Sequence, residues 1–214
     1  MAHTLEARWF ASLPLPPALR DGFDALGLVK TRSQTDLYLP TEDASLNVKL
    51  RDGHMQIKRR LSGPFQKALA PHATGNLEHW TKWSFPLTTE RAALWDDDPT
   101  DLWVPVQKTR HQLAVPPSEQ TALADTLPTA PPATLNAELT TVEAGPDKAW
   151  TLCVEAEGPT PSLSDTLLTA APHLLDDLSS VSLSPDQSYG YARWLQQRPG
   201  ANPHPAPTVR ISDF

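Results

Sequence analysis

The stretch Trp150–Gly158, with the sequence WTLCVEAEG, alternates between apolar and polar residues with a period of two. Such alternation is typical of a β-strand that has one buried face. The apolar face would be formed by Trp150, Leu152, Val154 and Ala156. The polar face carries Glu155 and Glu157, and two carboxylates side by side on one face repel each other. The stretch therefore predicts a strand whose polar face is either wetted by solvent or holds something positively charged.

The same alternation recurs along the chain. It predicts eight strands, at residues 3–10, 34–40, 46–51, 54–60, 77–86, 103–112, 134–143 and 149–157. Asp52-Gly53 is a strong hairpin signal between the third strand and the fourth. Because consecutive strands joined by tight turns form antiparallel sheets, the sequence predicts an α+β protein, mainly antiparallel β, with helices packed on one face of the sheet.

Helical patterns occupy several of the connections. Pro17–Gly27 has apolar residues on one face and ends at a glycine. Residues 162–178 are rich in leucine, and Pro172 is expected to kink or divide that helix. A third helix is expected to begin after Ser184, which forms a capping-box pattern with Gln187. Weaker helical patterns lie at 88–95 and 118–126.

The length, net charge and cysteine count of the chain limit the class of protein to which it can belong. The chain has 214 residues and a net charge of −7, which argues against a nucleic-acid partner. Its one cysteine, Cys153, excludes an internal disulfide framework and fits a reducing compartment. No signal-peptide pattern or membrane-length apolar run occurs, so we expect a cytoplasmic protein without a membrane partner. We expect a single domain at 1–198 and a proline-rich tail at 199–214.

Charge is sorted between the polar faces of the predicted strands. The middle strands present the cations Lys49, Arg51, Lys58, Arg60, Lys82, Lys108 and Arg110. The first, seventh and eighth strands present the carboxylates Glu6, Glu138, Glu155 and Glu157. A sheet whose polar side faces water is the ordinary interpretation of each strand alone, but a solvated face normally mixes signs. A closed sheet with basic walls and a carboxylate cluster would instead hold a polyanion together with a divalent metal.

The carboxylate cluster suits Mg²⁺ or Mn²⁺. These ions prefer oxygen ligands and often use one or two carboxylates together with waters and substrate phosphates. Phosphoryl transfer needs in-line positioning, a metal that bridges phosphate oxygens, and cations that absorb negative charge. Four residues are therefore candidate metal ligands, namely Glu6, Glu138, Glu155 and Glu157.

Eight motifs, in order and spacing, resemble the CYTH superfamily of triphosphate tunnel metalloenzymes. They are TLEAR, QTDLYL, LNVKLR, QIKRR, VQKTR, AELT, CVEAE and SYGYARWL, and they span residues 3 to about 196. The resemblance implies an eight-stranded antiparallel closed barrel with helices packed outside and a lumen that binds triphosphate. Members of the superfamily include inorganic triphosphatases, thiamine triphosphatases and class IV adenylyl cyclases.

The resemblance also implies roles for individual residues. It implies phosphate contacts for Lys49, Arg51, Lys58, Lys108 and Arg110, and the basic faces add Arg8, Arg60 and Lys82 as further candidates for binding substrate phosphates. The candidate catalytic residues are Glu6, Glu155 and Glu157. The chain departs from the family pattern at two places. Thr4 stands where the opening motif has its first acid, and the fifth strand offers Glu78, Trp80 and Lys82 where the family tends to have Arg-x-Glu-x-Glu. Both changes should weaken a metal site more than phosphate binding.

The sequence is compatible with three functions. The first is a divalent-metal-dependent hydrolase of inorganic tripolyphosphate or an organic triphosphate, with water attacking the terminal phosphoryl group. The second is a catalytically degenerate module that binds polyphosphate or nucleotides, and the third is an interaction domain with a solvated sheet face. Trp80 could stack on an organic group of the substrate or fill the barrel. The sequence identifies neither the substrate nor the oligomeric state.

Overall fold

The computed structural model describes residues 1–27, 29–88, 102–115 and 133–198. The proline-rich tail at 199–214 and the weaker helical patterns at 88–95 and 118–126 lie outside these residues, apart from residue 88.

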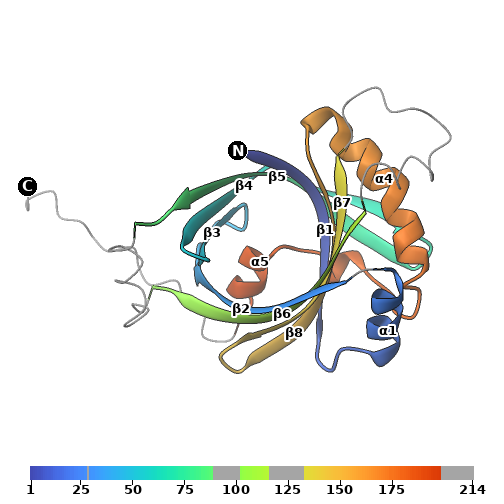
Figure 1. Ribbon diagram of the computed structural model, residues 1–214, viewed down its shortest axis with the longest axis horizontal. Coiled ribbons are helices and arrows are strands. Elements are labelled where there is room, and N and C mark those ends of the chain that lie inside the picture. Colours follow the sequence, from blue (N-terminus) through green and yellow to red (C-terminus); the bar gives the residue numbers. More distant parts are fainter. Residues whose placement is uncertain (28, 89–101, 116–132, 199–214) are drawn as a thin grey trace, which may run out of the picture.

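Eight antiparallel strands close into one barrel, in the order β1-β5-β4-β3-β2-β6-β7-β8 (Figure 1). They are β1 (Ala2–Ser12), β2 (Lys30–Leu39), β3 (Leu46–Arg51), β4 (His54–Ala70), β5 (Ala73–Pro86), β6 (Val104–Val115), β7 (Thr134–Ala144) and β8 (Asp147–Glu157). The prediction of an eight-stranded closed antiparallel barrel with helices outside is confirmed. Closure depends on β1, which pairs with β5 on one side and β8 on the other.

The fourth and fifth strands are longer than the sequence pattern predicted. Residues 61–76 are mostly strand, because β4 continues to Ala70 and β5 begins at Ala73. Gly63 and Pro64 hide this extension, since both interrupt the alternation and are typical of turns. The structure accommodates them by register shifts between Arg60 and Phe65, after which the two strands pair again. The result is a twisted ribbon that extends beyond the barrel wall.

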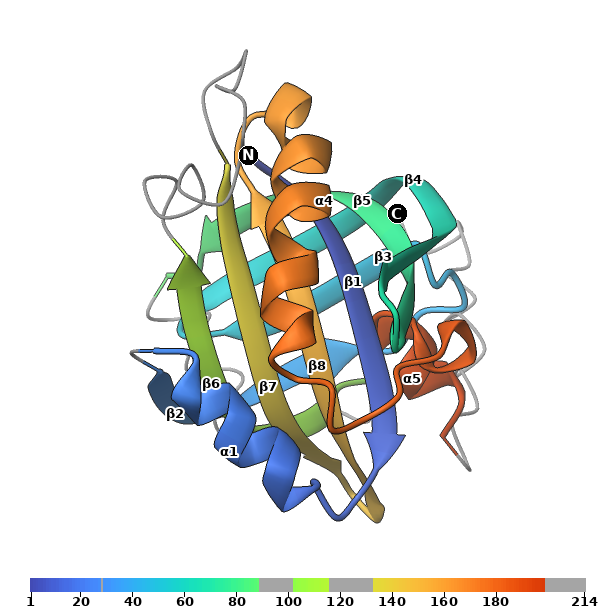
Figure 2. The same ribbon diagram turned by 90° about the vertical axis from the view of Figure 1, so that its right-hand side faces the viewer.

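The larger hydrophobic cluster lies outside the barrel. The apolar face of β8 turns outward and packs with buried residues of α4 (Thr160–Asp176), among them Leu167 and Ala171. Helix α1 (Pro17–Ala25) buries Leu19 and Phe23 in the same cluster. Figure 2 shows α4 running along the face formed by β1, β7 and β8. The charged side chains of the opposite faces are turned into the lumen, and one end of the lumen is filled by a second hydrophobic cluster that includes Phe10, Tyr38, Val106 and Tyr191.

Proline at position 172 does not divide the predicted helix, which is α4 and continues to Asp176. The last turn beyond Pro172 buries Leu174 and Leu175 against the barrel. This apolar contact offsets the hydrogen bond that a proline removes from the helix interior.

The single helix predicted after Ser184 is wrong. The capping box is present, but it starts only a short 3₁₀ helix, η1 (Pro185–Gln187). The chain then becomes extended: the Tyr189 amide donates to the carbonyl of Arg8, and Asn76 binds the carbonyl of Ser188. A separate helix, α5 (Tyr191–Gln196), begins after Gly190. Pairing with β1 therefore overrides the local helical pattern.

Helix α5 closes over the lumen between distant strands (Figure 1). The ring of Tyr191 packs edge-on against Phe10 of β1 and stacks with Tyr38 of β2, at centroid distances of 5.3 and 5.5 Å. None of the helices in the described part of the chain is long and apolar enough to cross a membrane.

Candidate functional site

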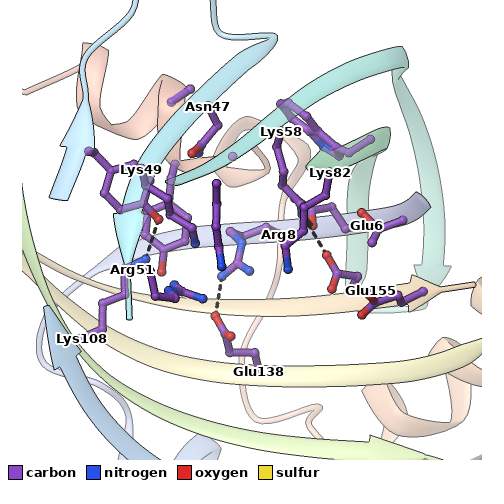
Figure 3. A pocket seen from close by; sticks show the side chains of 18 of the residues that line it. Glu6, Arg8, Asn47, Lys49, Arg51, Lys58, Lys82, Lys108, Glu138 and Glu155 are labelled. Atoms are coloured by element: carbon purple, nitrogen blue, oxygen red, sulfur yellow. Dashed lines mark hydrogen bonds and ion pairs between the residues drawn. The ribbon is translucent and has the colours of Figure 1, made fainter. Parts of the chain in front are cut away.

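The lumen holds a charged cavity of about 120 Å³. A single water needs roughly 10–15 Å³ by the same measure, so the cavity has room for a small polar ligand. Seven basic side chains and four carboxylates line it, and the buried carboxylate of Asp36 pairs with three of the seven, which leaves an excess of two positive charges. The basic and acidic lining residues are Arg8, Lys49, Arg51, Lys58, Lys82, Lys108, Arg110, Glu6, Glu138, Glu155 and Glu157. Figure 3 shows nine of these side chains, all but Arg110 and Glu157, pointing toward one another from different strands.

Arg60 is the one expected site residue that does not line the cavity. Its guanidinium forms an ion pair with Glu78 instead, and both side chains are largely buried. Burial raises the pKa of Glu78, and the neighbouring guanidinium opposes that rise.

Asp36 is the centre of an ion cluster at one end of the lumen. Its side chain is completely buried, its Oδ1 accepts a hydrogen bond of 2.7 Å from Arg51 Nε, and Arg51 Nη2 contacts Oδ2. Lys108 Nζ lies 2.9 Å and Lys49 Nζ 3.7 Å from the same carboxylate. Burial alone would raise the pKa of Asp36, but Lys108 and Arg51 hold it well below its usual range. The carboxylate therefore stays ionised and holds three basic side chains. Burial lowers the pKa of Lys108 to about 7 and also lowers the pKa of Lys49, and the charge of Asp36 opposes both shifts.

Glu138 forms a second cluster with two arginines. Arg8 Nη1 lies 3.1 Å from Oε1, and Arg110 Nε donates to Oε2 at 2.8 Å. Burial favours the neutral acid, but Arg8 and Arg110 lower the pKa of Glu138 well below its usual range. A carboxylate held by two guanidinium groups is poorly placed to bind a metal as well.

Glu6 and Glu155 form the third cluster. They lie directly opposite each other in the register of β1 and β8, and Lys58 Nζ lies between them, 2.8 Å from Glu6 and 3.0 Å from Glu155. Burial raises the pKa of Glu6. Burial acts in the same sense on Glu155, but Lys58 and a hydrogen bond from Glu6 lower its pKa. The two acids are therefore arranged to share a proton beside a lysine.

Two charged residues of the lumen stand apart from these clusters. Glu157 is exposed and Lys82 is half-buried. Neither forms an ion pair within the described residues. They are available to a ligand without breaking an existing contact.

The carboxylates fit a metal only in part. Across residues 1–27, 29–88, 102–115 and 133–198, no three acidic, histidine or cysteine side chains are grouped so that they could hold a metal ion. Two adjacent carboxylates do fit a Mg²⁺ or Mn²⁺ ion that arrives with substrate phosphates and waters. In the β1–β8 register Thr4 stands opposite Glu157, and its buried hydroxyl has no hydrogen-bond partner.

Several lumen residues were not among the sequence candidates. Asp36 and Tyr38 fall on the polar face of the alternating second strand, which is the signal that could have found them. Asn47 shares the alternation of Lys49 and Arg51. Tyr191 comes from α5, and the strand pattern gives no indication that this helix reaches the lumen.

Comparison with known proteins gives matches at low identity. No family model and no curated protein matches the chain. A structure of a candidate adenylyl cyclase from Hippeastrum, described as having a dominant triphosphatase activity, is 16% identical at a TM-score of 0.40 over 86% of this chain and 91% of the other. A candidate adenylate cyclase from Bacillus halodurans is 15% identical at a TM-score of 0.40, covering 86% and 95%.

An RNA triphosphatase from S. pombe is 13% identical at a TM-score of 0.40, covering 84% of this chain and 78% of the other. The chain is therefore similar over most of its length to these three proteins, at a level too low to transfer their activities, and its function has to be argued from its own lumen.

Proposed function

We propose that the lumen binds the phosphate chain of a small triphosphate-bearing molecule and that the protein hydrolyses its terminal phosphoryl group with the help of a divalent metal. The observation that supports this proposal most strongly is the excess of positive charge in the lumen cavity, although the whole chain has a net charge of −7. Cations held close together repel each other and raise the free energy of the empty site. A polyanion relieves that repulsion, so the arrangement favours phosphate chains.

The phosphates would be bound along the basic wall. Lys82 has no ion pair within the described residues and would meet a phosphate directly, while Lys49, which lies 3.7 Å from Asp36, would turn toward the ligand. Arg8, Arg51 and Arg110 are each held in place by a carboxylate. Because those guanidinium groups are fixed, their remaining N–H groups can bind phosphate oxygens without a further loss of side-chain freedom.

A Mg²⁺ or Mn²⁺ ion would be held by Glu6 and Glu155, with Glu157 as the further candidate. Glu138 would have to give up its contacts with Arg8 and Arg110 before it could serve as a ligand. When bound, such an ion supplies charge neutralisation at the phosphoryl group that is transferred. Lys58 would then exchange its contact with the two glutamates for one with the phosphate chain. The glutamate oxygens left free by that exchange can accept a hydrogen bond from the attacking water.

A non-catalytic binding module is the second candidate, and one observation favours it. Lys58 already neutralises the pair formed by Glu6 and Glu155, and Thr4 adds no carboxylate. A lumen balanced in this way could hold polyphosphate without a metal.

The decisive experiment is phosphate release from tripolyphosphate, thiamine triphosphate and ATP in the presence of Mg²⁺, Mn²⁺ or a chelator. The hydrolase proposal expects release that the chelator abolishes. Binding without release in any of these conditions would support the binding module instead.

Tripolyphosphate is expected to raise the melting temperature. A ligand at about 100 times its dissociation constant stabilises by about 2.7 kcal/mol, which corresponds to roughly 5–10 °C for a chain of this size. Rising salt should reduce the shift as charges are screened. Lys49→Gln should reduce the shift and Lys148→Gln, at an exposed position outside the lumen, should leave it unchanged. Absence of a shift at millimolar ligand would overturn both functions.

A further inference from the structure

The ammonium group of Lys58 lies between two carboxylates that belong to different strands (Figure 3). Lys58 itself belongs to β4, so its side chain reaches past β5 to contact Glu6 on β1 and Glu155 on β8. Its Nζ also lies 6.0 Å from the centroid of the Trp80 ring, whose face attracts a cation. Burial opposes the charge of Lys58, but Glu155 and Glu6 raise its pKa above the usual value. The side chain is therefore a cation fixed beside the two acids.

A divalent ion held by the same two acids would need the space that Lys58 occupies. Mg²⁺ binds oxygen ligands at about 2.0–2.1 Å, so it would have to lie between the oxygens of Glu6 and Glu155. The ammonium group already contacts these oxygens, at 2.8 and 3.0 Å. Two cations so close together in a partly buried site repel each other strongly. An ion can therefore bind there only after Lys58 has left.

The empty lumen gives the displaced ammonium group no equivalent contact. In the β4–β5 register Lys58 stands opposite Lys82, which carries a like charge. Asp36 already holds three basic side chains, and Glu138 holds two arginines. Glu157 is exposed, so solvent screens its charge. A metal that enters alone must therefore break two ion pairs of Lys58 without replacing them.

A phosphate chain changes this balance. Phosphate oxygens bound by Lys82 would lie beside Lys58, because the two lysines are paired across β4 and β5. Lys58 could then turn from the glutamates to the phosphate and keep a negative partner. The oxygens of Glu6 and Glu155 would become free at the moment when the phosphate chain is in place. Each ligand thus removes a cost from the binding of the other, which is a positive coupling between them.

We propose that Lys58 is an internal counter-ion that keeps divalent metal out of the empty lumen and leaves the two glutamates only when a phosphate chain binds, so that metal and polyphosphate bind cooperatively. The proposal rests on the function proposed above and deepens it by naming how the metal site is regulated. Lys58 acts here through the glutamates and is a positioning residue for the metal.

The first test measures Mn²⁺ binding to the protein without phosphate, by the electron paramagnetic resonance signal of the free ion. We expect Lys58→Met to bind Mn²⁺ about tenfold or more tightly than the wild type, because the glutamates lose their competing cation. Mn²⁺ should also raise the melting temperature of Lys58→Met and leave that of the wild type unchanged. Lys58→Gln should behave in the same way if Lys58→Met does not fold.

Lys82→Met is the matched control. It removes the same charge from the position opposite Lys58, but Lys82 forms no ion pair within the described residues. It should strengthen Mn²⁺ binding much less than Lys58→Met does. Equal strengthening by both variants would show that only the total charge matters and would refute the proposal. Mn²⁺ binding to the wild type as tight as to Lys58→Met, or to neither protein, would refute it as well.

The second test measures the coupling by isothermal titration of tripolyphosphate, with and without saturating Mg²⁺. Mg²⁺ should strengthen binding to the wild type by a larger factor than binding to Lys58→Met, because the glutamates of the variant are open to the metal before the phosphate arrives. Equal factors would contradict the coupling. Failure of the wild type to bind tripolyphosphate in either condition would refute the proposed function, while the Mn²⁺ comparison still decides whether Lys58 excludes the metal.

Discussion

Replacing Asp36 with asparagine is expected to destabilise the barrel by about 3–5 kcal/mol, because the change leaves buried cations without their counter-charge. Asp36 is completely buried and contacts Arg51, Lys108 and Lys49. Asparagine keeps the shape of the side chain but removes the charge that offsets the desolvation of these groups. Urea unfolding followed by tryptophan fluorescence would measure the loss.

Asp52→Asn is the matched control. Asp52 forms an ion pair with Arg32 in which both side chains are about half exposed, so its loss should cost about 1 kcal/mol or less. A similarly small loss in Asp36→Asn would mean that the buried cluster does not hold the strands together. Tripolyphosphate should partly restore the variant, since phosphate can replace the missing negative charge.

The effect of Asp36 also depends on pH. Its pKa is lowered in the folded state from about 3.9 in an unfolded chain, so its contribution is fully present above about pH 4 and is lost as the pH falls further. The difference in stability between wild type and Asp36→Asn should therefore be constant near neutrality and shrink below about pH 4. A constant difference down to pH 2 would contradict this account.

Glu155→Gln is expected to abolish metal-dependent phosphate release, with a loss of about 100-fold or more, because a neutral amide is a poor ligand for Mg²⁺. Folding should survive, since Lys58 keeps its contact with Glu6 and one of two adjacent carboxylate charges is removed. Initial rates of release with saturating Mg²⁺, together with melting curves, would measure both effects.

Glu143→Gln is the control for Glu155→Gln, because it removes the same charge from an exposed ion pair with Lys148 on β7 and β8. It should release phosphate at the wild-type rate. If the protein only binds polyanions, Glu155→Gln should raise affinity, and Thr4→Glu should give no gain in turnover. Unchanged release in both Glu155→Gln and Glu157→Gln would refute the metal-site assignment.

Period-two alternation was sufficient to predict the eight strands and the direction of their side chains, whereas the closure of the sheet into a barrel was predicted from the family resemblance. Because residues of one parity share a face, assigning Glu155 to the polar face also placed Glu157 there, and the same holds for Lys49 and Arg51. Alternation fails where glycine and proline interrupt it, which is why the strand through Gly63 was missed. Alternation also cannot predict a contact such as that between the Tyr189 amide and β1.

Which side chains pair with each other could not be predicted from the sequence. Alternation places Asp36, Lys108 and Arg51 in the lumen but does not say that one carboxylate collects all three cations, since that depends on strand order and register. It likewise gives no indication that Lys58 lies between Glu6 and Glu155. These pairings decide which of the candidate site residues are free to bind a ligand. The position of the site could therefore be predicted from the sequence, but the ion pairs within it could not.

The pairing of β1 with β8 joins the first strand of the barrel to the last, and we expect it to form late in folding. Thr4 pairs with Glu157 and Glu6 with Glu155, contacts that join opposite ends of the barrel sequence. Contacts so distant along the chain form slowly, because loop-closure entropy is lost before they are gained. A nascent chain lacks β8 until residue 157 has left the ribosome, and until then β1 has an unpaired edge. No incomplete intermediate can therefore have the candidate metal site, and the capacity to act on a triphosphate arises only when the sheet has closed on itself.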